Sequence, residues 1–238
     1  MSQFKVLITT SGTGSRLGDL TKNKNKALIE INGRPTIAYV LDSYSPNIPL
    51  VITLGYLGNQ VREFMLHEFP NRQFEFVTVD PYEGPGSSLG YSISCAREKL
   101  QCPFIFHACD TILIEPIPAP DKNWLGGYIP PEFEWASSSV HYRTHQVKNN
   151  KVVKVNDKGA KDFNSVHIGL SGIHDYEIFW RALDVILKSP KSDSDVFVIE
   201  KMLSWGVEFA WVPYKTWLDT GNLEALEKTS SFLKNQSS

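Results

Sequence analysis

Short apolar runs alternate with amphipathic runs along the first half of the chain. The apolar runs are rich in β-branched residues and predict buried strands over Phe4–Thr10, Leu50–Leu54, Phe74–Val79 and Phe104–Ala108. The amphipathic runs predict helices over Thr36–Tyr44, Leu57–Phe69 and Ser87–Leu100. This alternation is typical of an α/β protein with a mixed, mainly parallel sheet that helices flank on both faces.

The second half of the chain has a different pattern. Proline and aromatic residues crowd Ile112–Tyr142, which we interpret as a long excursion rather than regular layers. Strands resume at Ala136–Tyr142, Lys151–Val155, Val166–Ile173 and Val207–Val212. Helices are predicted over Tyr176–Leu187, Asp195–Trp205 and Leu223–Leu233. We expect a single domain over residues 1–238, with a loose tail at Asn235–Ser238.

Composition and charge argue against several classes of protein, including nucleic-acid-binding and membrane proteins. With 238 residues, of which 42% are hydrophobic, the chain can bury a substantial core. A net charge of −2 provides no general attraction for nucleic acid. The cysteines Cys95, Cys102 and Cys109 form no CxxC pair, which favours a reducing compartment and opposes a zinc ribbon. No apolar run resembles a signal peptide or a membrane span, so we expect a cytoplasmic protein without a membrane partner.

A glycine-rich turn follows the first strand directly. Backbone amides at Gly12 and Gly14, with the cations Arg16 and Lys26 nearby, offer the donors that a polyphosphate needs. A GxGxxG dinucleotide site is not matched because Leu17 stands at the third glycine position, and the chain has no Walker sequence. A GxG turn by itself is as often purely structural, but the two cations favour a nucleoside triphosphate.

Two aspartates stand at predicted strand ends. Asp110 follows the apolar run PFIFHAC, and Asp219 lies between a strand and the last helix. Separately, Asp110 could be a loop acid and Asp219 a helix cap. Together they offer the hard oxygen ligands that Mg²⁺ prefers beside phosphates. A glycosyltransferase DxD motif is absent, because Thr111 and Ile112 follow Asp110.

Several motifs in order resemble one enzyme family. They are GTGSRL at 12–17, NKAL at 25–28, GRP at 33–35, ACDTIL, VVKVNDKG and WLDTGNLEAL. This pattern, from about Phe4 to Leu226, resembles the nucleotidyltransferases that activate sugar 1-phosphates and their relatives, the phosphocholine cytidylyltransferases. The resemblance implies a Rossmann-like, glycosyltransferase-A-like fold. It also implies a nucleotide-binding half at residues 1–111 and an acceptor-binding half at residues 112–238.

The resemblance also implies roles for individual residues. Arg16 and Lys26 would be catalytic, and Asp110 and Asp219 would bind Mg²⁺. The nucleotide would be bound by two short segments, namely Gly12, Thr13, Gly14 and Ser15, and then Gly84, Gly86, Ser87 and Ser88. Lys158 would contact the acceptor phosphate.

Two departures from the family pattern affect these roles. Asn25 replaces the usual proline, which should leave Lys26 less rigidly held. Asp157 and Gly159 flank Lys158 in place of Glu and Pro, so Lys154 or Lys161 could replace it.

The expected reaction transfers a nucleoside monophosphate from a triphosphate to a sugar 1-phosphate and releases pyrophosphate, as in nucleotide-sugar and polysaccharide biosynthesis. The alternatives are a non-sugar acceptor such as phosphocholine, or an inactive regulator that binds nucleotide sugar. Five rings could stack on a sugar, enclose choline or pack a loop: Trp124, Tyr128, Phe133, Trp135 and Tyr142. His141 and His145 lack a third zinc ligand and are read as ordinary polar positions. The base and the oligomeric state stay open.

Overall fold

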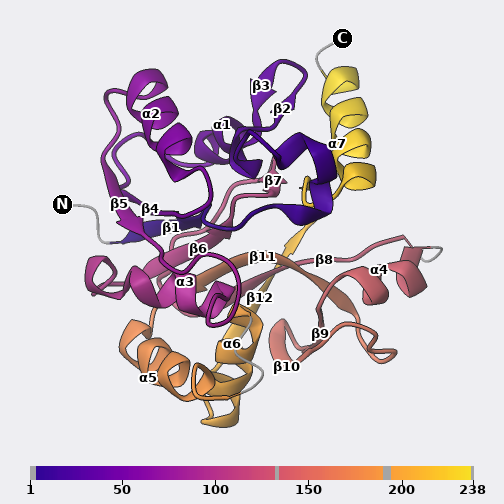
Figure 1. Cartoon of the computed structure of the whole chain (residues 1–238). Coiled ribbons are helices and arrows are strands. Elements are labelled where there is room, and N and C mark those ends of the chain that lie inside the picture. Colours follow the sequence, from indigo (N-terminus) through magenta and orange to yellow (C-terminus); the bar gives the residue numbers. More distant parts are fainter. Residues whose placement is uncertain (1–3, 132–133, 190–193, 237–238) are drawn as a thin grey trace.

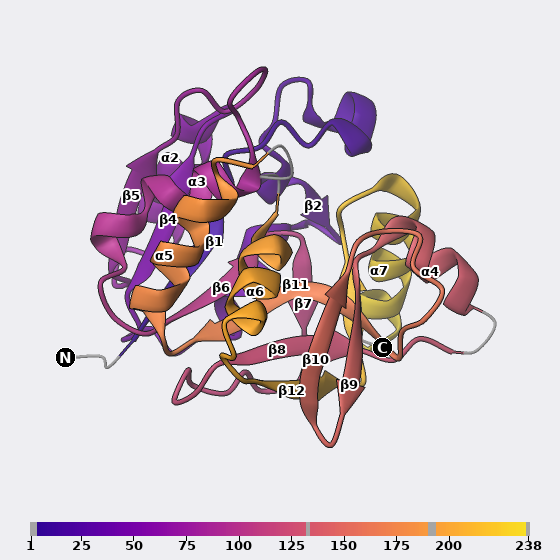
Figure 2. The same ribbon diagram turned by 90° about the horizontal axis from the view of Figure 1, so that it is seen from below.

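One sheet runs through both halves of the chain. The computed structural model describes residues 4–131, 134–189 and 194–236 (Figure 1). Nine strands lie in the order β5-β4-β1-β6-β11-β8-β12-β10-β9. Their bounds are β1 Lys5–Thr9, β4 Leu50–Leu54, β5 Phe74–Thr78, β6 Phe104–Ala108, β8 Trp124–Tyr128, β9 Thr144–Lys148, β10 Lys151–Asn156, β11 Ser165–Ile173 and β12 Phe209–Tyr214. Figure 2 shows β5 and the β9–β10 hairpin at opposite sides of the molecule.

The sheet is mixed. The four strands of the first half, β5, β4, β1 and β6, pair in parallel, as the strand–helix alternation predicted. The second half joins through β11, which is antiparallel to both β6 and β8, and β12 then pairs in parallel with β8. The predicted mixed α/β class is therefore confirmed, and the parallel pairs are concentrated in the first half.

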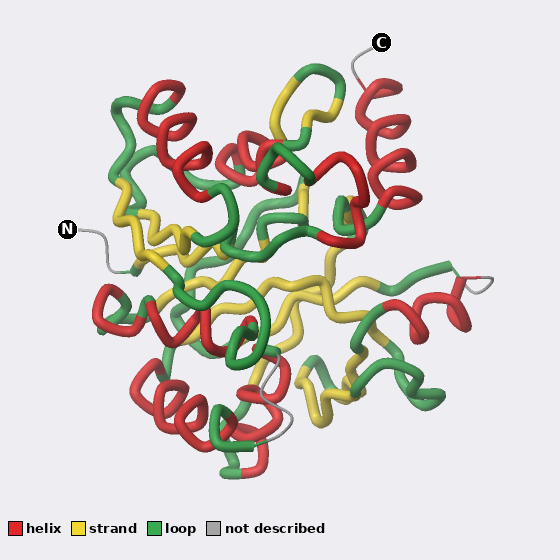
Figure 3. Tube along the Cα trace, in the orientation of Figure 1, coloured by secondary structure: helices red, strands yellow, loops and turns green. Residues whose placement is uncertain are grey.

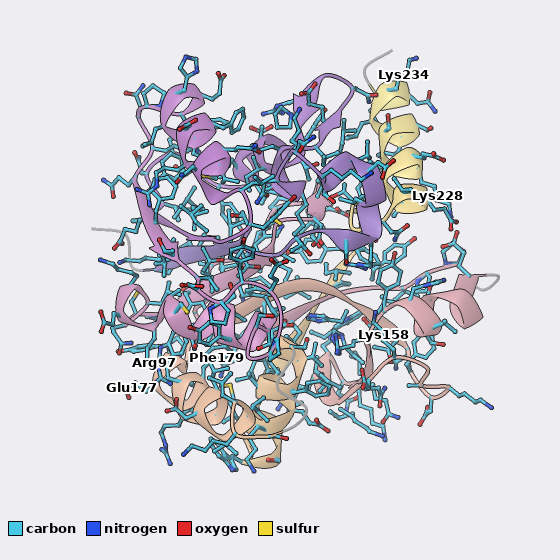
Figure 4. All side chains as sticks on the ribbon, in the orientation of Figure 1. Arg97, Lys158, Glu177, Phe179, Lys228 and Lys234 are labelled. Atoms are coloured by element: carbon cyan, nitrogen blue, oxygen red, sulfur yellow. The ribbon has the colours of Figure 1, made fainter. Side chains whose placement is uncertain are left out.

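Helices cover both faces of the sheet (Figure 3). In the view of Figure 1, α1 (Thr36–Asp42) and α2 (Gly58–Glu68) lie above it, and α3 (Leu89–Cys95), α5 (Tyr176–Ile186) and α6 (Asp195–Ser204) lie below. Side chains of β1 alternate between the two cores: Val6 and Ile8 pack toward α1 and α2, and Leu7 packs toward α3 and α5. The lower layer is tied together at η3 (Arg97–Lys99), where Arg97 donates to the Trp180 carbonyl of α5 at 2.8 Å (Figure 4).

The ring-rich stretch Ile112–Tyr142 is more regular than predicted. It holds most of β7 (Thr111–Leu113), all of β8 and the helix α4 (Trp135–His141). The irregular interpretation was wrong for β8 because its two glycines are packing residues. A Cβ on Gly127 would collide with the Trp211 indole and the Ser165 hydroxyl.

The predicted strand at Ala136–Tyr142 is also wrong, because this segment is α4 and its end. Its alanine and serines lack the β-branched side chains that favour a strand. The hairpin strand β9 was missed. Its turn to β10 uses Asn149 and Asn150, both with left-handed φ of 51° and 58°, which asparagine tolerates.

The remaining elements are short, apart from the last helix. They are η1 (Ser15–Thr21), η2 (Lys26–Leu28), β2 (Glu30–Ile31), β3 (Arg34–Pro35), β13 (Trp217–Asp219) and α7 (Leu223–Gln236). The tail expected at Asn235–Ser238 is therefore helical through Gln236, and its last two residues lie outside the described ranges. Helix α7 packs beside the β2–β3 turn, where Asn32 donates to the Ser230 carbonyl at 2.9 Å. Within the described ranges, every helix is too short or too polar to cross a bilayer.

Candidate active site

A cavity of about 560 Å³ opens at the carboxyl ends of β1 and β6 and extends into the second half of the chain. This is the edge at which open α/β sheets bind ligands. The first half contributes, among others, Ser11, Gly12, Thr13, Arg16, Lys26, Gly84, Ser87, Ser88 and Asp110. The second half contributes His141, Tyr142, Arg143, Lys158, His167, Asp195, Trp217 and Asp219. Both halves of the predicted site therefore face one space.

The glycine-rich turn is shaped around Lys26. Gly14 has a left-handed φ of 69°, and a Cβ there would lie 2.8 Å from the Lys26 Cβ. Gly12 has open space where a side chain would be, and it lines the cavity with Thr13. Gly14 and Ser15 are not among the lining residues. Their role is to form the turn, while Gly12 and Thr13 face the ligand space.

Asn25, which replaces the family's proline, anchors Lys26 by hydrogen bonds. The Asn25 side chain is completely buried and donates to the carbonyls of Thr10 (3.0 Å) and Tyr56 (2.6 Å). Its Oδ1 accepts from the Ala27 amide at 2.9 Å and caps η2. These bonds hold the segment before Lys26 where the family pattern has a proline ring, and the expectation of a less rigidly held Lys26 stays a prediction.

Lys26 and Arg16 both approach Asp110. Lys26 Nζ lies 3.1 Å from Asp110 Oδ2, and Arg16 Nη2 lies 4.0 Å from the same oxygen. Burial tends to raise the pKa of Asp110, but the charges of Lys26 and Arg16 outweigh it and hold that pKa below its usual range. Burial likewise tends to lower the pKa of Lys26, and the Asp110 charge raises it above its ordinary value. The lysine and the aspartate are therefore an ion pair.

Asp219 reaches Asp110 through a two-stranded ribbon. In the β7–β13 pair, Asp219 lies opposite Thr111, and the Thr220 amide donates to the Asp110 carbonyl at 2.9 Å. A Cβ on Gly221 would be 3.1 Å from Arg16 Nη2, 3.1 Å from Asp219 Oδ1 and 3.3 Å from Asp110 Oδ2, so the guanidinium and both carboxylates approach Gly221. Burial, and then the negative charge of Asp110, raise the pKa of Asp219.

The local alternative for Asp219, a cap on the last helix, is not what the structure shows. Asn222 Oδ1 instead accepts from the Ala225 amide at 3.0 Å, in the first turn of α7. Asp219 Oδ1 accepts from the Gly221 amide at 3.0 Å. The aspartate is thus held in place by its own loop and faces the cavity.

From the sequence, Tyr142 was considered only as one of five aromatic rings, and the contact of its hydroxyl with Asp219 was not predicted. Its Oη donates to Asp219 Oδ2 at 2.7 Å, and its ring packs edge-on against Trp217 with centroids 4.7 Å apart. Both rings line the cavity. The ring of a phenylalanine could pack in the same way, so a pattern of aromatic residues in the sequence does not predict the hydrogen bond made by the Tyr142 hydroxyl.

The second predicted nucleotide-binding segment is the loop between β5 and α3. Gly84 and Gly86 have left-handed φ of 76° and 89°. Ser88 Oγ accepts from the Tyr91 amide at 2.9 Å and caps α3, and Ser87 Oγ donates to the Gly84 carbonyl at 2.7 Å. Of these four residues, all except Gly86 line the cavity.

Lys158 lies on the loop after β10, beside α4 (Figure 4). The Gly159 amide donates to the Ser139 carbonyl of α4 at 2.6 Å, which holds this loop against the helix. Lys158 lines the cavity, whereas its alternatives Lys154 and Lys161 do not. The structure therefore favours Lys158 among the three lysines.

The three aromatic side chains of this stretch that the structure describes lie in different surroundings. Trp124 is buried and donates to the Ala119 carbonyl at 3.2 Å, and Tyr128 packs near Trp217 with centroids 5.9 Å apart. Of the five rings, Tyr142 lines the cavity, Phe133 lies outside the described residues, and the Trp135 side chain is not described. Packing explains most of the described rings.

The two histidines examined as a pair do not face one another. His141 lines the cavity at the end of α4, whereas His145 is buried on β9. His145 Nε2 lies 3.1 Å from His167 Nδ1, and His167 Nε2 lies 3.1 Å from Asp195 Oδ2. This buried chain of polar groups reaches the cavity at His167 and Asp195, and sequence reasoning did not find it.

The donors at Asp110 and Asp219 suit a hard divalent cation. Burial, and then the negative charge of Asp110, raise the pKa of Asp219, and a bound cation would offset both effects. Across the described residues, no three His, Cys, Asp or Glu side chains are grouped to hold a metal. Further ligands would be phosphate oxygens and water, which Mg²⁺ commonly keeps.

Comparison with known proteins supports the resemblance for the first half of the chain. Residues 6–117, which contain the glycine-rich turn, Lys26 and Asp110, match the family model of the MobA-like NTP transferase domain. The predicted resemblance to nucleotidyltransferases is confirmed. The choline-phosphate cytidylyltransferase of Streptococcus pneumoniae is 27% identical to this chain over 107 residues, which is 44% of each chain. The matched region is thus less than half of that relative.

Solved structures extend the likeness to the whole nucleotidyltransferase fold. The CTP:phosphocholine cytidylyltransferase of S. pneumoniae superposes with a TM-score of 0.73 at 18% identity and covers 98% of this chain and 100% of its own. A UDP-glucose pyrophosphorylase from Acinetobacter baumanii superposes with a TM-score of 0.78 at 13% identity and covers 99% and 94%. At such identities the likeness concerns the fold, and the acceptor must be argued from the site.

Proposed function

We propose that this chain transfers a nucleoside monophosphate from a nucleoside triphosphate to a sugar 1-phosphate and releases pyrophosphate. One observation carries the proposal. Arg16, Lys26, Asp110 and Asp219 meet at one cavity, and Lys158 lines the acceptor half of the same space. Two fixed cations and two carboxylates around one point match the needs of a triphosphate with its metal ion.

The reaction requires no nucleophile from the protein. An oxygen of the acceptor phosphate attacks the α-phosphorus, a new P–O bond forms, and the bond from the α-phosphorus to the bridging oxygen breaks. Pyrophosphate leaves with that electron pair. Lys26 would stabilise charge on the transferred group, and Arg16 would stabilise the leaving pyrophosphate. Lys158 would hold the acceptor phosphate.

Asp110 and Asp219 would hold Mg²⁺, whose charge offsets that of the phosphates. Tyr142 and the Gly221 amide orient the Asp219 carboxylate for this role.

A second candidate is transfer to phosphocholine, favoured by the sequence match to a choline-phosphate cytidylyltransferase. An inactive regulator is disfavoured, because binding alone does not require all four charged residues. A cytoplasmic location and a place in nucleotide-sugar and polysaccharide biosynthesis stay predictions.

The test is a pyrophosphate-release screen of the full chain. Four nucleoside triphosphates are crossed with several sugar 1-phosphates and phosphocholine, each with and without Mg²⁺. We expect release with at least one sugar 1-phosphate, dependent on Mg²⁺. Release with phosphocholine alone would replace the first candidate with the second. Absence of pyrophosphate release with every combination would favour the inactive regulator that binds nucleotide sugar.

A further inference from the structure

A buried aspartate–histidine pair lines the acceptor half of the cavity, and the proposed reaction does not use it. Asp195, the first residue of α6, is 4% exposed, and its Oδ2 lies 3.1 Å from His167 Nε2 on β11. Its Oδ1 accepts from the Ser194 hydroxyl at 2.9 Å. Asp195, His167 and Ser194 all border the cavity.

The hydrogen bonds fix the direction of every donor in this group. A carboxylate only accepts, so His167 Nε2 carries its proton and Nδ1 is left to accept from His145 Nε2. Burial tends to raise the pKa of Asp195, but the contacts with His167 and Ser194 and the charge of Arg143 hold it below its usual value. Asp195 is therefore a rigid anion with only acceptor atoms.

Such a carboxylate can bind hydroxyl groups of a ligand. It has about four acceptor positions, and His167 and Ser194 take two of them. A hydroxyl that donates to an ionised acceptor makes one of the stronger neutral-to-charged hydrogen bonds. A sugar or cyclitol phosphate brings several hydroxyls into the same half of the cavity as its phosphate.

Choline phosphate has no hydroxyl group that could donate to Asp195. Charge alone does not select the head group, because Arg143 and Lys158 line this half of the cavity together with the carboxylates of Asp195 and Asp219. The Arg143 guanidinium also lies 5.1 Å from the centre of the Phe197 ring, so this ring is already engaged by a cation.

We propose that Asp195, positioned by His167 and Ser194, is a specificity residue that accepts hydrogen bonds from hydroxyl groups of the acceptor. The acceptor is then a polyol phosphate, either a sugar or a cyclitol phosphate, and not choline phosphate. This inference rests on the proposed function of the same cavity. It assigns the part of that cavity which recognises the carbon skeleton rather than the phosphates.

The experiment crosses a change in the protein with a change in the ligand. Pyrophosphate release by the wild type and by Asp195→Asn is measured with glucose 1-phosphate, myo-inositol 1-phosphate and singly deoxygenated analogues of each. We expect Asp195→Asn to lower kcat/KM for the best hydroxylated acceptor by about tenfold to a hundredfold, the effect of a lost hydrogen bond to a charged group. For at least one deoxy analogue the same substitution should change kcat/KM less than threefold. Equal losses for every acceptor would overturn the proposal, because they would mean that Asp195 only supports the fold.

A matched control is available at the start of the neighbouring helix. Asp175 precedes α5, pairs with Asn123 and His174, and does not line the cavity. Asp175→Asn should leave the ratio between hydroxylated and deoxy acceptors unchanged. If Asp195→Asn does not fold, the deoxy analogues are compared in the wild type alone. The proposal is overturned if kcat/KM for every analogue is within threefold of that for its parent. It is also overturned if the wild type prefers phosphocholine to both polyol phosphates.

Failure of the proposed function can be distinguished from failure of this inference. If no acceptor supports turnover, calorimetric binding of the two polyol phosphates to the wild type and to Asp195→Asn replaces the rate measurement. Binding that weakens at least tenfold in the variant supports the inference for an inactive binding protein. Absence of binding to either polyol phosphate overturns it.

Discussion

Lys26 Nζ lies 3.1 Å from Asp110 Oδ2, although 84 residues separate the two along the chain. The contact joins the segment after β1 to the end of β6, its parallel neighbour. Because neighbouring parallel strands end at the same sheet edge, their following loops meet there. The order of the strands thus places the cation of the proposed reaction against Asp110, the acid that we propose as a metal ligand.

Lys26→Ala should lower turnover at least a hundredfold. Loss of one preorganised charge at a phosphoryl-transfer centre costs about 2.7–4 kcal/mol of transition-state stabilisation. The matched control is Lys24→Ala, since Lys24 pairs with Glu30 at the surface, and its turnover should change less than twofold. Circular dichroism checks that both variants fold. Near-normal turnover of Lys26→Ala would remove this lysine from the mechanism.

Tyr142→Phe should lower kcat/KM by about tenfold or more, because a hydrogen bond to a charged group contributes roughly 1.5–3 kcal/mol. The effect should appear as weaker binding of Mn²⁺ in the presence of the triphosphate, measured by electron paramagnetic resonance. Tyr128→Phe is the control, since its ring also packs near Trp217 but does not contact Asp219. Equal Mn²⁺ affinity in Tyr142→Phe and the wild type would contradict an orienting role.

Asp219→Asn should stabilise the metal-free protein and abolish stabilisation by Mg²⁺. A folded-state pKa raised above 3.8 means that ionised Asp219 destabilises the fold, so its contribution falls as pH rises through that raised pKa. Asparagine removes this cost at neutral pH. In the wild type, Mg²⁺ at a hundredfold excess over its Kd should add about 2.7 kcal/mol. Thermal unfolding at pH 7 with and without Mg²⁺ measures both effects, and equal Mg²⁺ shifts would place the metal elsewhere.

Stability should fall as pH drops from about 6.5 toward 4, partly through His107. This buried histidine bonds to Tyr44 (2.7 Å) and the Thr111 carbonyl (2.8 Å), and burial lowers its pKa to about 4. The unfolded state then binds a proton that the native state does not, so acid favours unfolding by up to about 3 kcal/mol. Burial lowers the pKa of His145 as well, which adds in the same direction.

Urea unfolding at pH 7.5 and pH 4.5 measures this effect. His107→Gln should have a smaller pH dependence than the wild type, and substitution of the exposed His67 should leave the dependence unchanged. An identical pH dependence in His107→Gln would show that His107 is not the group involved.

Gly14→Ala should impair both stability and nucleotide use. The left-handed φ of 69° costs about 1–3 kcal/mol for a residue with a Cβ, and that Cβ would push against Lys26. Gly206→Ala is the control, because its φ of 84° is also left-handed, its Cβ would meet no atom within 4 Å, and it does not line the cavity. Both variants should unfold more easily, but only Gly14→Ala should raise the KM for the triphosphate by about tenfold. Matching KM values would mean that the clash is absorbed without moving Lys26.

The sequence by itself determined the elements whose signals are local. Mostly apolar runs predicted β4 and β6 with their observed bounds, because strands buried on both faces contain few polar residues. The turn at Gly14 and the cations after it were also readable, because they belong to one short segment. The local signal was misleading at Gly127 in β8, where glycine is needed because a Cβ would collide with the indole of Trp211, which is distant along the chain.

Tertiary structure alone decided which distant groups meet. Asp219 reaches Asp110 through the register of β7 with β13, Tyr142 reaches Asp219 from the end of α4, and Asp195 reaches His167 where α6 begins beside β11. None of these contacts has a spacing along the chain that a pattern could record. They depend on the order of the strands in the sheet and on how the helices pack on it. Burial stabilises many apolar residue types to a similar degree, so the local sequence does not specify which distant residues come into contact.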